Sequence, residues 1–270
     1  MSATGLVEPV LKPLFAKVLD RFFLCGQRYQ PSFTDFYDPA KWTVFFNALK
    51  YKNKDIEVVA FGGAEDCERR MLGFFPIKYN KSNEVSENVK SRDIAKFPIV
   101  SLRIEHNTKF NKTPRHQDYL GSVLGLGFDR GRIGDIFISK EHADIFVYEE
   151  IADYICSQLE KIGRVPVKCR VSSGQNLEIS KPQELETQIN VASMRLDVIA
   201  AAAFRLSRGQ VQALIGAEKV FVNWSPCADR GKNLKPGDMI SAKGYGRVRI
   251  GEILGTTKKD RIRLGILRQS

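Results

Sequence analysis

Apolar residues recur with different periods along the chain, and these periods predict where helices and strands lie. Residues 6–23 carry apolar side chains at near-helical spacing, and Asp38-Pro39 is typical of a helix start, with an N-cap followed by a proline in the first turn. The β-branched run at residues 56–61, bounded by Gly62-Gly63, indicates a strand and a turn. We therefore expect a mainly helical first domain with a short strand at residues 1–80.

A second set of patterns predicts a domain at residues 93–173. Strands are expected at 97–104, 133–139, 143–148 and 166–171, with one helix starting at Thr113-Pro114 and another at 149–162. The order β-α-β-β-α-β is that of ferredoxin-like domains, a plan shared by RNA-recognition domains and many unrelated proteins. The aromatic signature of RNA-stacking domains is not visible in the central strands, so an RNA role for this domain stays open.

The last part of the chain, residues 191–270, predicts a small domain of two helices and several strands. Ser193 is the expected N-cap of the first helix, and Ser207 with Gln210 forms a capping box for the second. Strands follow at 220–223, 239–242 and 247–250, with a turn at 235–238. Period two in the last strand puts Arg247 and Arg249 on one face. The polar stretches at 80–92 and 172–190 separate the three domains.

Basic charge is concentrated in the last domain. The whole chain has a formal net charge of +11, and residues 193–270 hold 15 Lys and Arg against 6 Asp and Glu, whereas the rest holds 27 against 25. Such a segment indicates a polyanionic partner, although a solvated surface or adhesion to anionic lipid would show the same composition. No apolar run is long enough to span a membrane, no secretory signal is evident, and the five cysteines lack the spacing of a disulfide framework or zinc site.

The candidate contacts are cationic and polar side chains of the last domain. On an ideal helix Arg208, Gln212 and Lys219 lie within about 40° of one another, which predicts a polar stripe on one outer face. The predicted contacts to structured RNA are Arg195, Arg205, Ser207, Arg208, Gln212, Lys219, Asn223, Lys243, Arg247 and Arg249. A second contact is expected at Lys109, Lys112, Arg115 and His116, the alternative being a polar loop that joins a strand to a helix. Each residue taken singly is also explained as solvated surface, and Ser207 by capping alone.

These residues also carry a resemblance to known families. The segments 194–197, 206–208, 219–223 and 235–240 resemble the S-four (S4) RNA-binding domain, with Glu218 standing where that family usually has glycine. The segments 33–36, 68–70, 116–121 and 133–136 are similar to the YlmH family. The resemblance implies an N-terminal domain, an RNA-recognition-like middle domain and a C-terminal S4 domain. It further implies a ribosome-associated protein, in a bacterial cytoplasm or a plastid stroma, linked to rescue of stalled large subunits carrying peptidyl-tRNA.

Enzymatic alternatives find little support in the sequence. Arg195-Leu196-Asp197 is similar to the motif of pseudouridine synthases, but too few residues follow for that catalytic domain. There is no glycine-rich cofactor loop after a strand, no signature of a tyrosyl-tRNA synthetase, and no metal-ligand spacing among His106, His116 and His142. We expect a monomeric binder of rRNA or tRNA without cofactor, metal or catalysis. The alternatives are an RNA-modifying enzyme with its active site in the middle domain, or an assembly partner whose first two domains bind protein.

Overall fold

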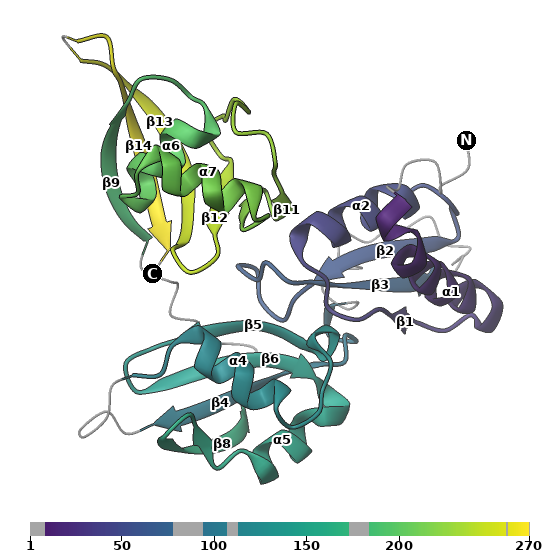
Figure 1. The fold of residues 1–270 in the computed structure, drawn as a ribbon. Coiled ribbons are helices and arrows are strands. Elements are labelled where there is room, and N and C mark those ends of the chain that lie inside the picture. The colour runs from purple at the N-terminus through teal and green to yellow at the C-terminus, as the bar shows by residue number, and fades with distance from the viewer. Residues whose placement is uncertain (1–8, 78–93, 107–112, 173–183, 258, 270) are drawn as a thin grey trace. The chain divides into compact units, whose positions relative to one another are not determined.

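The chain forms two compact units, residues 1–181 and residues 182–270, in a computed structural model. The structure describes residues 9–77, 94–106, 113–172, 184–257 and 259–269. Figure 1 shows the elements of both units. No helix in the described ranges has the length and apolar character needed to cross a membrane.

The first unit begins with two helices on a small sheet. A 3-10 turn, η2 (Pro9–Leu11), leads into α1 (Lys12–Arg28), and α2 spans Pro39–Leu49. The strands β1 (Ser32–Phe33), β2 (Ile56–Phe61) and β3 (Met71–Pro76) form a sheet in the order β1-β3-β2, which the two helices cover (Figure 1). Asp38 caps α2 by accepting from the Lys41 amide at 3.1 Å, so this helix start and the strand at 56–61 are confirmed. The first helix begins later and runs further than predicted.

The middle of the chain has the predicted ferredoxin-like plan. Its elements are β4 (Ile99–His106), α4 (His116–Leu124), η3 (Arg130–Arg132), β5 (Ile133–Ile138), β6 (His142–Tyr148), η4 (Glu149–Ile151), α5 (Ala152–Gln158), β7 (Lys161–Ile162) and β8 (Val165–Ser172). They form a sheet in the order β5-β6-β4-β8-β7, which confirms the fold class. The helix predicted at 149–162 is wrong at its end. Residues 161–162 instead pair with β8 across a turn in which Gly163 has a φ of 59°.

A shared aromatic core joins these two parts of the first unit. Phe36 and Phe75 of the first part pack in one cluster with Phe97, Phe137 and Phe146 of the middle part. Backbone bonding adds to it, since the Phe36 amide donates to the Gly131 carbonyl at 2.7 Å. The predicted boundary between the first two domains falls at residues outside the described ranges, and the proposed division into three domains stays a prediction.

The second unit is a six-stranded antiparallel sheet with two helices on one face. Its elements are β9 (Glu184–Val191), α6 (Leu196–Phe204), α7 (Arg208–Gly216), β10 (Val220–Val222), β11 (Ser225–Pro226), β12 (Met239–Ala242), β13 (Gly246–Thr256) and β14 (Ile262–Gln269). The sheet order is β11-β10-β12-β13-β14-β9. All of strand β9 but its last residue, Val191, lies in the stretch 172–190 predicted to be a polar boundary. It pairs with β14 along eight residues. The sequence pattern of this segment does not indicate a strand, and the hydrogen bonds to β14 are what hold it in one.

Two local predictions in this unit are corrected by tertiary contacts. Helix α6 begins at Leu196 and not after Ser193, because the amides of Leu196 and Asp197 donate to the carbonyls of Lys232 and Arg230. A loop from elsewhere in the unit therefore satisfies the helix start without a side-chain cap. Helix α7 ends at Gly216, so Lys219 lies beyond the helix and the predicted stripe contains only Arg208 and Gln212.

Candidate nucleic-acid interface

The strand β13 presents its arginines away from the helices. Val248 and Ile250 are buried in the core with α6 and α7, whereas Arg247 is exposed and Arg249 is half-buried. This alternation confirms the predicted faces of the strand. It also places the predicted RNA-contact residues on two faces of the sheet, because Arg249 lies on the face opposite the helices and Arg208 lies on α7. The predicted residues therefore do not form one continuous cationic flank.

One end of the sheet gathers three of the predicted cations, which we call the basic end: Lys219, Lys243 and Arg247. The Lys243 amide donates to the Lys219 carbonyl at 2.9 Å, where β10 begins and the turn after β12 starts. Arg247 lies opposite Ser241 of β12, next to that turn. All three side chains are exposed. Three positive charges on adjoining backbone segments are suited to contact the phosphates of a nucleic acid.

A second group lies at the N-terminus of α7. Ser207 caps this helix by accepting from the Gln210 amide at 3.2 Å, and the Gln210 side chain accepts from the Ser207 amide at 2.9 Å, so the predicted capping box is confirmed. Arg208 and Gln212 are exposed on the helix, and Arg205 is exposed just before it, with a φ of 56° at the C-cap of α6. The Ser207 hydroxyl already accepts a hydrogen bond in the cap. Arg205 and Arg208 are therefore the groups at this place that we expect to contact phosphates.

Arg195 lies at the start of α6, apart from these two groups, and forms an ion pair within the domain. Its guanidinium donates to both carboxylate oxygens of Asp197, at 3.1 and 3.2 Å, and Asp197 is 3% exposed. The arginine therefore neutralises a buried charge as well as facing solvent. The exposed Arg230 and Lys232 lie in the loop bonded to the start of α6, beside Arg195. Sequence reasoning missed both, although their position around Gly231 marks an exposed turn.

Asn223 has an internal role. Its side-chain amide donates to Asp238 at 2.8 Å, and its side-chain oxygen accepts from the Met239 amide at 2.9 Å. Asn223 and Trp224 have φ values of 48° and 66° in the two-residue connection between β10 and β11. Both positive angles are those of a tight hairpin turn, in which asparagine is favoured at the first position. The side chain therefore holds the turn to the segment 235–238.

The predicted second contact is described only in part. Lys109 and Lys112 lie outside the described residues. Arg115 is exposed and pairs with Asp118 in the first turn of α4, and His116 begins that helix. His106 is instead buried: its Nε2 donates to the Lys140 carbonyl at 3.1 Å, and its Nδ1 accepts from the Tyr119 hydroxyl at 2.8 Å. Burial lowers the pKa of His106, so this histidine is a neutral core residue.

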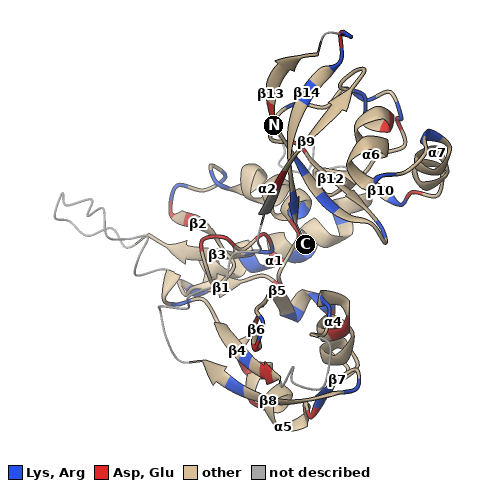
Figure 2. Ribbon diagram, turned by 90° about the vertical axis from the view of Figure 1, so that its left-hand side faces the viewer, with Lys and Arg blue, Asp and Glu red and all other residues tan. Residues whose placement is uncertain are grey.

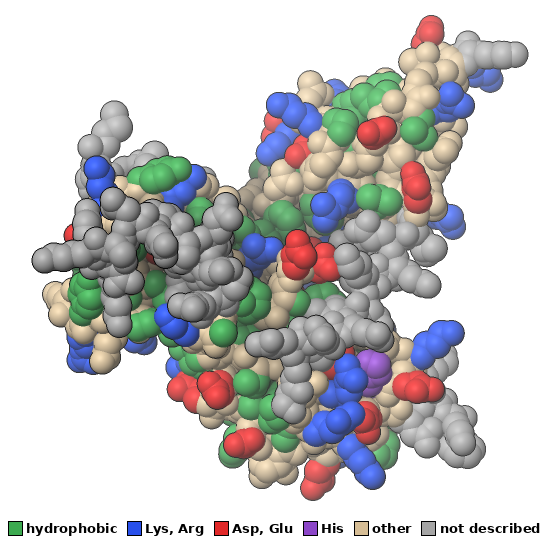
Figure 3. Space-filling view, turned by 180° about the vertical axis from the view of Figure 1, so that it is seen from behind, with side chains coloured by type: hydrophobic (Ala, Val, Ile, Leu, Met, Phe, Trp, Pro, Cys, Tyr) green, Lys and Arg blue, Asp and Glu red, His purple; other side chains and the backbone are tan. Residues whose placement is uncertain are grey.

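The cations of the second unit are distributed over its helices, turns and strands. Figure 2 marks their positions along the ribbon, and on the face drawn in Figure 3 they alternate with acidic side chains. Binding to a polyanion would therefore depend on local groups such as the basic end and the start of α7. Such binding does not require positive charge over the whole surface. Salt screens exposed charges beyond about one Debye length, roughly 8 Å at physiological salt, so only cations near a phosphate contribute.

Comparison with known proteins places these groups in a family context. Residues 93–176 match the family model described as "Putative RNA-binding domain in YlmH", and residues 194–240 match the S4 domain. The chain is 29% identical over 243 residues to the ribosome-associated protein quality control protein P2 of Bacillus subtilis (strain 168), an alignment that covers 90% of this chain and 89% of that protein. Among solved structures, the cell division protein ylmH from Streptococcus pneumoniae matches with a TM-score of 0.49 and 20% identity, over 62% of this chain and 93% of that chain.

The chain thus combines, in order, a ferredoxin-like domain and a basic S4 domain, each matched by a family model, the first of which is described as a putative RNA-binding domain. These matches confirm the resemblance to the YlmH family, including the C-terminal S4 domain. The Glu68-Arg69-Arg70 segment of that resemblance meets the segment at 133–136 in the structure, since the Arg69 guanidinium donates to the Ile133 carbonyl at 3.1 Å.

Proposed function

We propose that the protein binds structured RNA through its S4 domain and acts as a ribosome-associated factor. The observation that carries this proposal is the basic end, where Lys219, Lys243 and Arg247 adjoin within a domain matched by the S4 model. The resemblance to a ribosome-associated quality-control protein along nine-tenths of the chain supports the ribosome as the source of that RNA.

The chemistry of the site favours recognition of the RNA backbone. Lysine and arginine neutralise phosphates and release counterions, which gives an affinity that falls with salt. A-form RNA presents its phosphates and 2′-hydroxyls on a surface that is read mainly by shape. The exposed Gln212 on α7 can hydrogen-bond to sugar or phosphate oxygens, while the arginine at 208 supplies charge.

The finer part of the proposal concerns which RNA is bound. We propose that the protein binds rRNA and tRNA on the large subunit. It would act in the rescue of large subunits that have stalled with peptidyl-tRNA, as a binding protein without catalysis. The quality-control name of the relative supports this choice. The cytoplasm of a bacterium, or a plastid stroma, is the corresponding place of action, and a monomer is the proposed form.

Sedimentation with ribosomes tests the proposal. The variant with Arg208→Ala, Lys219→Ala and Lys243→Ala removes three exposed cations whose side chains form no ion pair with any described residue. We expect each direct phosphate contact that is lost to weaken binding by about 1.5–3 kcal/mol and to reduce the salt slope by about one. Arg195 is left intact because its loss would also leave the carboxylate of Asp197 buried without a partner.

A matched control separates local contacts from net charge. Lys52→Ala, Lys54→Ala and Lys12→Ala remove the same number of exposed cations from the first unit. We expect this control to sediment with large subunits as the wild type does. Equal loss in both triple variants, or none in either, would overturn the assignment to the S4 surface. Labelled RNA altered by the protein with a common cofactor would overturn the proposal of a non-catalytic role.

A further inference from the structure

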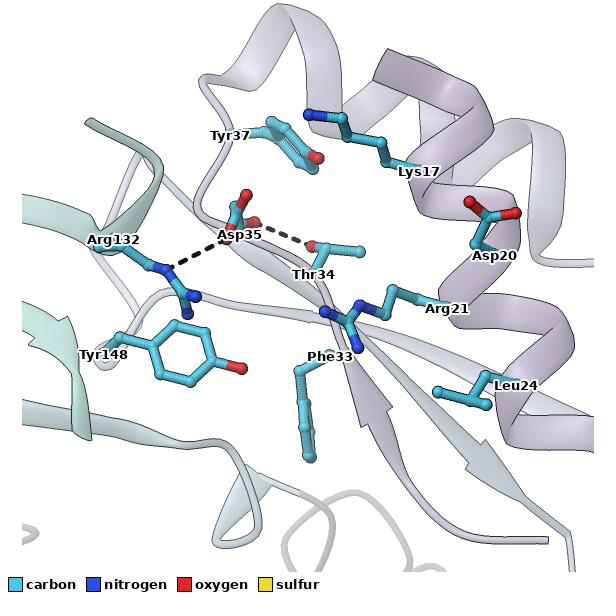
Figure 4. Close-up of a pocket in the computed structure, with 10 residues that line it drawn as sticks. All are labelled: Lys17, Asp20, Arg21, Leu24, Phe33, Thr34, Asp35, Tyr37, Arg132 and Tyr148. Carbon is cyan, nitrogen blue, oxygen red and sulfur yellow. Dashed lines mark hydrogen bonds and ion pairs between the residues drawn. The ribbon is translucent and has the colours of Figure 1, made fainter. Parts of the chain in front are cut away.

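The first unit holds a cavity of about 360 Å³ that the S4 proposal does not use. Helix α1 forms one wall, the segment after β1 forms another, and the third comes from Arg132 and Tyr148 of the middle part (Figure 4). Its size is within the range of pockets that hold small ligands. The cavity lies wholly within the residues of one compact unit.

Flat groups line one side of this cavity. The Arg132 guanidinium lies over the Tyr148 ring, 4.5 Å from its centroid. Glu150 lies 2.7 Å from it. Asp35 lies 3.8 Å from it (Figure 4), so its charge is largely compensated while its plane remains a stacking surface. The half-buried ring of Phe33 adds a second aromatic surface. Aromatic rings and arginine planes are the groups on which unpaired bases stack.

Charged groups line the other side. Lys17 and Arg21 project from α1 into the cavity region, and neither side chain forms an ion pair or hydrogen bond with any described residue (Figure 4). Asp20 lies between them on the same helix and offsets part of their charge. The two cations lie across the cavity from the stacked pair, so an anionic group and a flat group of one ligand could be held at the same time.

A tyrosine hydroxyl supplies a further polar group. Tyr37 is 7% exposed and lines the cavity, and its hydroxyl has no hydrogen bond to any described residue. The hydroxyl oxygen is not among the buried unpaired atoms of the described residues, so it is open to a ligand in the cavity. Burial raises the pKa of Tyr37 to about 12, so the hydroxyl stays protonated and able to donate.

We propose that this cavity binds one unpaired nucleotide of an RNA strand. The base lies against the surface formed by Arg132 and Tyr148, the phosphate is held by Lys17 and Arg21, and Tyr37 donates to the nucleotide. This is a second RNA contact that is separate from the S4 surface and does not require it. A free nucleotide would offer the same chemistry, and the experiment distinguishes the two sources.

Photo-crosslinking of the full-length protein tests the proposal. A short single-stranded RNA with a 4-thiouridine is bound and irradiated, and the attached peptide is identified by mass spectrometry. We expect crosslinks at Phe33 or Tyr148. Lys17→Glu with Arg21→Glu should lower the affinity for this strand at least about tenfold, since stacking without phosphate contacts contributes only part of single-strand binding. Uridine monophosphate in excess should compete less well than the unlabelled strand.

Control variants keep this site distinct from the S4 surface. Lys12→Glu with Lys54→Glu reverses the same charge outside the cavity and should leave the crosslink unchanged. Arg208→Ala with Lys219→Ala and Lys243→Ala should retain the crosslink even where ribosome binding is lost. Crosslinks confined to the S4 domain, or unaffected by the changes at Lys17 and Arg21, would overturn the proposal. Competition by uridine monophosphate as effective as that of the unlabelled strand would overturn the assignment to an RNA strand.

Discussion

Glu218 shows how a single position can depart from its family and still keep the turn. Its φ is 54°, in the left-handed region, at the end of α7. The Lys219 amide donates to the Leu214 carbonyl at 2.9 Å and the Glu218 amide to the Ile215 carbonyl at 3.0 Å. These two bonds define a Schellman motif, in which glycine is favoured because it has no Cβ. The resembling family's usual glycine at this position therefore has a conformational reason.

We expect Glu218→Gly to stabilise the second unit. The left-handed conformation costs a residue with a side chain about 1–2 kcal/mol, and the greater entropy of glycine in the unfolded chain offsets about half of this gain. The free energy of unfolding, from denaturant titration, should rise by about 0.5–1 kcal/mol. Glu218→Ala keeps the strain and removes the same charge, so it should show no such increase. A lower stability of Glu218→Gly than of the wild type would contradict the inference that Glu218 is strained.

The buried His106 predicts a pH dependence of stability. Its pKa is lowered in the folded state from the ordinary value of 6.5, chiefly by burial, so the unfolded chain binds the proton first as pH falls. Stability should therefore decrease as pH falls below about 6.5 and level off below the folded pKa. Urea titrations from pH 8 to pH 5 should show a smaller decrease for His106→Gln than for the wild type. Parallel pH profiles for the two proteins would refute the assignment to this residue.

At the scale of elements, Arg69 connects segments from both parts of the first unit. Its guanidinium donates to the carbonyls of Phe36 at 2.7 Å, Arg130 at 3.1 Å and Ile133 at 3.1 Å. The backbone amide of the same residue donates to Asp135 at 2.9 Å. Burial lowers the pKa of Arg69, because the half-buried guanidinium is partly removed from water. One planar side chain thus joins the starts of η3 and β5 to the segment between β1 and α2.

Arg69→Met should destabilise the first unit by about 2–4 kcal/mol, because three carbonyls lose a charged donor inside the structure. Arg70→Met is the matched control. Within the part of the chain that the structure describes, the Arg70 guanidinium donates to the Cys67 and Glu65 carbonyls of its own loop and stacks on Trp42, so its loss should cost less. Thermal unfolding of both variants measures the difference. Equal losses would show that Arg69 has no special role in joining the two parts.

At the scale of the whole molecule, the division into two compact units determines what folds alone. The core of the second unit includes Val191 of β9 together with Leu264 and Ile266 of β14. Strand β9 pairs with β14 from Val191↔Ile262 to Glu184↔Gln269. A domain of this size with its own core is expected to be an independent folding unit.

We expect a fragment of residues 182–270 to fold and to retain the RNA affinity of the S4 surface. A fragment of residues 192–270 lacks β9 and exposes the edge of β14, and it should melt at a lower temperature or associate through that edge. Circular dichroism and size-exclusion chromatography of the two fragments measure this. Equal melting temperatures and elution volumes would show that β9 is dispensable.

The sequence by itself determined the elements whose signals are local. The strand at 56–61, the cap at Asp38, the capping box at Ser207 and the alternation in β13 all follow from periodicity and side-chain chemistry within a few residues. The order of strands in the middle domain also follows from local patterns, because a β-α-β-β-α-β chain has few ways to cover one sheet.

Only the tertiary structure decided features that depend on distant partners. The start of α6 is set by the carbonyls of Arg230 and Lys232, and β9 exists because β14 pairs with it. The cavity beside Tyr148 is assembled from α1, the segment after β1 and the middle domain. No sequence pattern contains such contacts, because the hydrogen bonds and charges that create them come from residues far apart in the chain.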